Sequence, residues 1–221
     1  MGSGLHRLDI DPGNLDPDGI CENQTTAGAA DLVLNGALCD LGTALQFDIS
    51  DAYSAGIGGV LLAFDSAGDI SGVIFTITGK DQDGVAITET VTNVTTTAVL
   101  TTKYYSQVTN IAADSQVTSN VFVGTVTGEL ATKSIPINRF SQSAAAVAVS
   151  GLTGTCQFDI AQTFDDFRDG TTDMAWFNVL SNQSADVAGT AALGATGVRL
   201  VFDSYSNGAE LQFHVSFNPF L

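Results

Sequence analysis

The sequence predicts an all-β protein, and three observations support that prediction. Apolar and polar residues alternate with a period of two in many segments, as they do in strands that bury one face. Threonine is dense, and its branched Cβ favours strands because it restricts χ1 in a helix. No segment keeps a 3.6-residue apolar period over three turns. We therefore expect two β-sandwich-like modules in series, preceded by an extended acidic N-terminal arm.

The chain is predicted to have three parts. Residues 1–28 are acidic and contain Pro12-Gly13 and Pro17, a composition typical of an arm that becomes ordered only against a neighbour. Residues 29–131 form the first sandwich-like domain, and residues 132–221 form the second. The boundary is placed at an extended connector around Pro136, because proline restricts the residue before it to extended geometry.

A β-hairpin over residues 70–91 is the best-defined element of the first domain. Two runs rich in β-branched and aromatic residues flank a polar turn that closes at Asp83-Gly84, where glycine accepts a positive φ. Glu89 interrupts the apolar face of the second arm, which indicates an edge, a rim or a contact with another chain. Further strands are predicted over residues 32–34, 45–49, 60–64, 93–102, 105–111 and 117–123.

The second domain begins with an alanine-rich segment, residues 144–151. Alanine favours helix, but the alternating valines and the Ser-Gly stop favour a strand. Strands with alternating apolar residues are also predicted over residues 155–163, 198–202 and 211–217. Trp176 and Phe177, with Phe164 and Phe167, are interpreted as the core of this domain, since aromatic residues supply most of the burial in a small module. The alternative is a platform on which a sugar stacks.

The charge of the chain restricts its partners. The formal net charge is −17, from 24 acidic and 7 basic residues, and only 14% of residues are charged. Nucleic-acid affinity comes largely from Lys and Arg, so we expect no direct nucleic-acid binding. Binding to an anionic membrane is disfavoured for the same reason. A surface of Thr, Ser, Asn and Gly with few charges suits a protein that meets other subunits over much of its area.

The three cysteines, Cys21, Cys39 and Cys156, have no metal-like spacing. Three buried thiols are expected, with a single bridge between Cys21 and Cys39 as the alternative. The N-terminus has no hydrophobic region typical of a secretory signal, and no apolar run approaches the ~20 residues that span a bilayer. We expect synthesis in a cytoplasm, and no membrane contact.

Two groups of aspartates have the spacing that begins some calcium loops: Asp9, Asp11, Asp16 and Asp18, then Asp81 and Asp83 with Gly84. Neither loop has a bidentate Glu at its twelfth position, which excludes an EF-hand. The alternative is that both groups are solvated turns of an acidic protein.

Candidates for catalysis are few. His6 and His214 lie far apart in the sequence, and His214 falls opposite in phase to Phe213, so it faces outward or toward a neighbour. No Gly-x-Ser-x-Gly elbow is present for a serine nucleophile. Asp165 and Asp166 could be the paired carboxylates of a glycosidase, but a loop cap or turn is the simpler interpretation. We therefore expect no enzyme, no catalytic residues, no metal and no cofactor.

Two patterns carry a resemblance to a known family. The first is SGVIFTITGKDQDGVAITETV at residues 71–91, followed by threonine-rich sequence and YSQVTNI at residues 105–111. The second is QFDIAQTFDD at residues 157–166, followed by Trp176-Phe177 and by VRL at residues 198–200. In this order and spacing they resemble the virion structural proteins of tailed bacteriophages, over roughly residues 30–217.

The resemblance implies a repeated, non-enzymatic building block of a virion, with no catalytic residue to transfer. The expected partners are the major capsid protein or other virion subunits, together with copies of the chain itself in a symmetric homo-oligomer, a trimer or a ring. A capsid decoration or cement protein is the leading expectation, because its acidity suits the outside of a DNA-filled shell. A neck or tail ring component and a carbohydrate-binding or host-contact module are the alternatives.

Overall fold

The computed structural model describes residues 4–13, 15–40, 45–53, 56–125, 129–137, 144–165 and 174–217. The prediction of an all-β protein is confirmed, since 58% of the described residues lie in strands and 2% in helix. The chain forms two compact units. Unit 1 contains residues 1–14, 54–58 and 128–221, and unit 2 contains residues 15–53 and 59–127.

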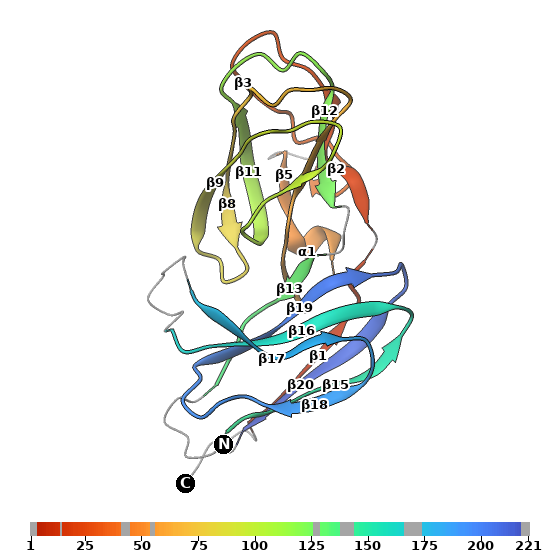
Figure 1. The fold of residues 1–221 in the computed structure, drawn as a ribbon, viewed down its shortest axis with the longest axis vertical. Helices are drawn as coiled ribbons and strands as arrows, with labels where there is room; N and C mark the ends of the chain where they lie inside the picture. The colour runs from red at the N-terminus through yellow and green to blue at the C-terminus, as the bar shows by residue number, and fades with distance from the viewer. Residues whose placement is uncertain are drawn as a thin grey trace. The chain divides into compact units, whose positions relative to one another are not determined.

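Unit 1 contains two layers of antiparallel strands, which Figure 1 shows. One layer has the order β1-β20-β15-β18, and in the other β19 pairs with β16, β13 and β14, while β16 pairs with β17. Their bounds are β1 (Gly4–Ile10), β13 (Leu130–Thr132), β14 (Ile135–Pro136), β15 (Ala146–Thr153), β16 (Cys156–Thr163), β17 (Trp176–Gln183), β18 (Val187–Thr190), β19 (Gly197–Tyr205) and β20 (Glu210–Phe217).

The core of unit 1 follows from the alternation along these strands. In the first layer Val149 and Phe213 are register partners and both are buried. In the second layer Phe158 pairs with Phe202, and both are fully buried. The alanine-rich segment is a strand, as the valine alternation predicted, because Val147 and Val149 both reach this core.

Unit 2 contains a sheet of order β10-β7-β12-β2 and a second group of strands around β11. β11 pairs with β3, β5, β6 and β8, while β4 pairs with β5 and β9 pairs with β8. Bounds are β2 (Asp16–Gln24), β3 (Ala30–Asp31), β4 (Cys39–Asp40), β5 (Gln46–Asp48), α1 (Ile49–Ala52), β6 (Ile57–Val60), β7 (Ala63–Ser66), β8 (Phe75–Asp81), β9 (Ala86–Val91), β10 (Val99–Leu100), β11 (Tyr105–Ala113) and β12 (Val121–Thr125). β6 contains the point at which the chain passes from one unit to the other.

Aromatic residues fill the core of unit 2. Phe64 on β7 and Phe75 on β8 have ring centroids 5.4 Å apart, so the two groups of strands meet through these rings. Phe47 and Tyr105 are fully buried as well. Burial of this kind is the main favourable term in folding such a unit.

The predicted hairpin is confirmed. β8 and β9 pair antiparallel from Phe75–Val91 to Lys80–Ala86, and Gly84 in the turn has φ +81°. In the described part of the chain β9 pairs only with β8, so it is an edge strand. The Glu89 carboxylate accepts hydrogen bonds from the backbone N–H groups of Thr102, at 2.6 Å, and Lys103, at 3.2 Å. The Glu89 carboxylate, which interrupts the apolar face of β9, therefore finds its hydrogen-bond donors within unit 2.

The prediction of an extended arm over residues 1–28 is wrong. Gly4–Ile10 pairs with β20 in unit 1, and Asp16–Gln24 pairs with β12 in unit 2. The serial order of two domains also differs from the structure, because unit 1 is assembled from three separate segments. The chain passes between units for the last time after residue 127, close to the predicted boundary after residue 131.

Several shorter predictions in unit 2 need correction. Only Val99–Leu100 of residues 93–102 is a strand, and Asn93 has φ +61°, which interrupts extended geometry. The run 60–64 is divided between β6 and β7, and residues 32–34 lie outside β3. Ile49 begins the short helix α1, because the Asp48 side chain accepts a hydrogen bond from the Ser50 N–H and caps it.

Candidate functional site

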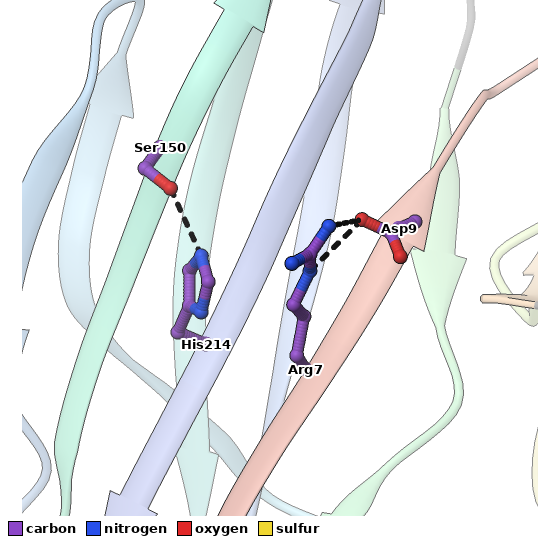
Figure 2. Close-up of polar contacts among 4 residues, drawn as sticks. All are labelled: Arg7, Asp9, Ser150 and His214. Carbon is purple, nitrogen blue, oxygen red and sulfur yellow. Dashed lines mark hydrogen bonds and ion pairs between the residues drawn. The ribbon is translucent and has the colours of Figure 1, made fainter.

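The outer face of the β1-β20-β15-β18 sheet carries a serine–histidine pair. Since Val149 and Phe213 point into the core, Ser150 on β15 and His214 on β20 lie on the opposite face. Ser150 Oγ lies 2.9 Å from His214 Nε2, and Figure 2 shows the ring turned toward the hydroxyl. His214 is half-buried, and its outward phase agrees with the prediction from the sequence.

A nucleophilic serine needs a base that a third group orients. Arg7 on β1 is the register partner of His214, and it lies between that ring and Asp9 in Figure 2. Arg7 donates to Asp9 Oδ1 from both Nε, at 3.0 Å, and a terminal nitrogen, at 2.6 Å. Among the described residues, no carboxylate bonds the His214 ring, so the pair lacks the third member of a triad.

The backbone amides that follow Ser150 are not free to form an oxyanion hole. The backbone N–H groups of Gly151 and Leu152, which follow the serine, donate to the two carboxylate oxygens of Asp186 at 3.1 and 3.0 Å. These bonds satisfy the amides of a β-bulge, where the register with β20 shifts and Gly151 has φ +67°. The Ser150–His214 bond is therefore a contact that ties β15 to β20, without the donors that acyl transfer requires.

A hollow of about 310 Å³ adjoins this pair at the end of the same sheet. Its lining residues are Asp9, Ile10, Asp11, Gly151, Glu210, Leu211 and Gln212. Two of its three carboxylates have partners within unit 1: Asp9 binds Arg7, and Asp11 Oδ1 accepts the Gly13 N–H at 2.9 Å. The hollow is acidic, and its field favours cationic groups over anionic ones.

The aspartate clusters have structural partners. Asp81 is buried, and its Oδ1 accepts the backbone N–H groups of Asp83, at 2.9 Å, and Val85, at 2.8 Å. This carboxylate therefore organises the hairpin turn. Burial, and then a hydrogen bond with Asp18, raise the pKa of Asp16. Within the described ranges no group of three or more His, Cys, Asp or Glu side chains is placed to hold a metal ion.

The aromatic residues near Trp176 are not the core that was predicted. Phe164 is 47% exposed and Phe177 is 53% exposed, while Trp176 is half-buried. The reason is that β17 pairs only with β16 in the described part of the chain, so it lies at an edge, and core positions are filled by Phe158 and Phe202 instead. Phe167 and Asp166 lie outside the described residues, so the predicted pair Asp165–Asp166 is seen in part only.

Two exposed aromatic side chains lie together at the end of β16. The Phe164 and Phe177 rings meet edge to face, with centroids 6.0 Å apart. Phe177 is the register partner of Gln162, whose side-chain oxygen accepts the Ala192 N–H at 2.7 Å. We call Phe164 and Phe177 the apolar patch.

Trp176 lies beside this patch and has a cationic neighbour. The Arg199 guanidinium carbon on β19 is 4.1 Å from the centroid of the indole ring. Arg199 is 8% exposed, and a partly desolvated cation over an indole face is a favourable contact. This contact holds Trp176 against unit 1 and leaves the apolar patch as the exposed aromatic feature.

No protein-family model, no curated protein and no solved structure matches the chain.

The predicted free thiols are present, since Cys21, Cys39 and Cys156 are all buried and unbridged. Among the described residues, no helix is long and apolar enough to cross a membrane. Sequence reasoning did not find the Ser150–His214 pair or the hydrogen bond between the Gln162 side chain and the Ala192 N–H. The register of β15 with β20 brings the first pair together, and the path of a loop brings the second. Neither contact leaves a local signal in the sequence.

Proposed function

We propose that the chain is a non-enzymatic structural protein of a tailed-phage virion, which acts as a decoration or cement protein on the outer surface of the capsid. The observation that carries the proposal is the apolar patch, because Phe164 and Phe177 are large side chains exposed together at one end of β16. Clustered exposed apolar side chains are typical of surfaces that bind another protein.

Two further features support a role in assembly. The ordered motifs at residues 71–91 and 157–166 resemble virion structural proteins of tailed bacteriophages. The net charge of −17 disfavours contact with packaged DNA and suits the outer side of a shell. A neck or tail ring is the alternative within the same class, since an acidic lumen also lets DNA pass.

The Ser150–His214 pair supports a non-enzymatic role. Within the described residues no carboxylate orients the His214 ring, and the amides that follow Ser150 bind Asp186 and are not free as oxyanion donors. The polar groups of the pair are used to hold strands together. The partners expected are the major capsid protein or other virion subunits, with a symmetric trimer or ring of the chain itself.

Electron cryomicroscopy of the virions of the phage that encodes the chain tests this proposal. At subnanometre resolution, density for both units on the outer surface of the shell is the expected result. Density in a neck or tail ring would favour the alternative position. Purified virions that lack the chain would contradict a structural role.

A carbohydrate-binding or host-contact module is a second candidate, favoured by the exposure of Phe164 and Phe177. The two rings are inclined at 61°, so a sugar would have to contact one ring face and the edge of the other. Glycan-array binding by the full chain tests this candidate. Binding that Phe177→Ala removes and Phe122→Ala, a half-buried residue of unit 2, preserves would support it. No binding to any glycan would contradict it.

A further inference from the structure

Two of the three cysteines lie in adjoining segments of unit 2. Cys21 is on β2 and Cys39 is on β4, and the segment before Cys39 runs beside β2. The Leu38 N–H donates to the Gly19 carbonyl at 2.7 Å. The Cys39 Sγ lies 3.4 Å from the carbonyl oxygen of Ile20, the residue that precedes Cys21.

A close backbone approach keeps these segments together. The Gly36 N–H donates to the Ile20 carbonyl at 3.1 Å, and a Cβ at position 36 would lie 2.1 Å from the Gly19 carbonyl carbon. Only glycine fits such a contact. The backbone hydrogen bonds of Gly36 and Leu38 therefore hold the segment before Cys39 against β2, and they keep the Cys39 thiol next to Ile20.

Both thiols are shielded from solvent. Cys21 is fully buried and Cys39 is 9% exposed. Burial, and then the neighbouring Cys39, raise the pKa of the Cys21 thiol well above its usual range. Burial raises the pKa of Cys39 to about 11. The thiolate is the reactive form, so both groups react slowly with external reagents. The Cys39 thiol points at the carbonyl of the residue that precedes Cys21, so the two cysteines are neighbours in the fold.

We propose that Cys21 and Cys39 are an oxidisable pair that forms an intrachain disulfide within unit 2. Cys156 remains a thiol, because it is buried on β16 in the other unit. The inference does not depend on the proposed function. A disulfide here would close the loop between residues 21 and 39 and restrict the unfolded chain, which stabilises the folded unit.

The reaction needs a two-electron oxidant, and diamide is the probe. Cys39 is the less buried thiol; its thiolate attacks the N=N bond of diamide and forms a sulfur–nitrogen bond. The Cys21 thiolate then attacks the Cys39 sulfur, the sulfur–nitrogen bond breaks, and the hydrazine leaves. The two protons of the thiols end on the hydrazine nitrogens, the two sulfurs are oxidised and the azo group is reduced.

The experiment treats the native full chain with diamide, then unfolds it in denaturant, alkylates the remaining thiols with N-ethylmaleimide and maps the peptides by mass spectrometry. The expected result is one alkylated thiol, on Cys156, and one peptide pair that joins Cys21 to Cys39. Thermal unfolding of the oxidised chain is expected several degrees higher, and a reductant should reverse the shift.

Two variants complete the test. Cys156→Ser keeps Cys21 and Cys39, so after diamide treatment it should have no thiol left to alkylate. Cys21→Ser should form no intrachain disulfide. Three alkylated thiols in the treated native chain would overturn the proposal, and so would a disulfide that includes Cys156 or joins two chains. If Cys21→Ser fails to fold, the peptide maps of the native chain and of Cys156→Ser still decide the question.

Discussion

The two units differ in what they do with their aromatic side chains. Unit 2 buries Phe47, Phe64, Phe75 and Tyr105 completely. Unit 1 buries Phe158, Phe202 and Phe213 but leaves Phe164 and Phe177 about half exposed beside the edge strand β17. Burying an exposed Phe side chain contributes roughly 1.5–3 kcal/mol of favourable free energy. Contact with another molecule would therefore be stabilised by covering this exposed aromatic pair. The comparison supports the proposal that unit 1 carries the surface for a partner.

Two carboxylates, one in each unit, differ as well. In unit 2 hydrogen bonds, first from the Ile74 N–H and then from Ser115, lower the pKa of Asp114. In unit 1 burial, and then the charge of Asp203, raise the pKa of Glu129. Asp114 is therefore held ionised at its turn, whereas Glu129 lies where its charge is disfavoured, as Asp16 does in unit 2.

The largest predicted effect is on the two cores. We expect Phe75→Ala in unit 2 and Phe213→Ala in unit 1 each to lower the free energy of unfolding by about 3–5 kcal/mol, because each leaves a cavity at a fully buried site. Phe177→Ala should change it by no more than about 0.5 kcal/mol. Denaturant unfolding measures all three. A cost for Phe177→Ala equal to that of Phe213→Ala would break the comparison.

A smaller effect is predicted at a glycine of unit 2. A Cβ at Gly79 on β8 would lie 1.9 Å from the backbone carbonyl oxygen of Gln107, which cannot move without disturbing β11. We expect Gly79→Ala to cost about 1–3 kcal/mol or more, as overpacking does. Gly72→Ala is the matched control, since a Cβ there meets nothing within 4 Å. Equal thermal stability of the two variants would show that the β8–β11 register is wrong.

The smallest effects concern pH and have opposite signs in the two units. Asp114 has a lowered pKa, so its stabilisation is present at neutral pH and is lost as the pH falls through the folded-state value. We expect Asp114→Asn to be less stable than the native chain at pH 7, with the difference shrinking toward pH 3. Melting temperature measured across this range gives the result.

Glu129 has a raised pKa, so its ionised form destabilises unit 1 at neutral pH, and the penalty is relieved as the pH falls. Glu129→Gln should therefore be more stable than the native chain at pH 7, and the gain should disappear in acid. If both variants shift melting temperature in the same direction at pH 7, the contrast between Asp114 and Glu129 does not hold.

Local signals explain what could be predicted from the sequence. The β8–β9 hairpin was found because its turn glycine and its alternating arms lie within one short stretch. The alanine-rich strand β15 was found because Val147 and Val149 alternate in phase. Both features depend on residues that are neighbours in the chain.

Long-range pairing explains what was missed. The predicted arm contains two strands, and each pairs with a distant segment: residue 4 pairs with residue 217, and residue 24 pairs with residue 121. No local pattern in the sequence carries that information. Trp176 and Phe177 were expected in the core because of their size, but the core was already filled, and β17 lies at an edge. The apolar patch depends on both of these facts.

Sedimentation velocity at micromolar concentration tests most directly the claim that unit 1 meets other subunits through the apolar patch. The native chain is predicted to sediment as an oligomer, and Phe164→Ser/Phe177→Ser as a monomer. Val33→Ser/Ile74→Ser, which removes exposed apolar side chains from unit 2, should sediment like the native chain. A patch variant with the same distribution as the native chain, whether oligomer or monomer, would contradict the account.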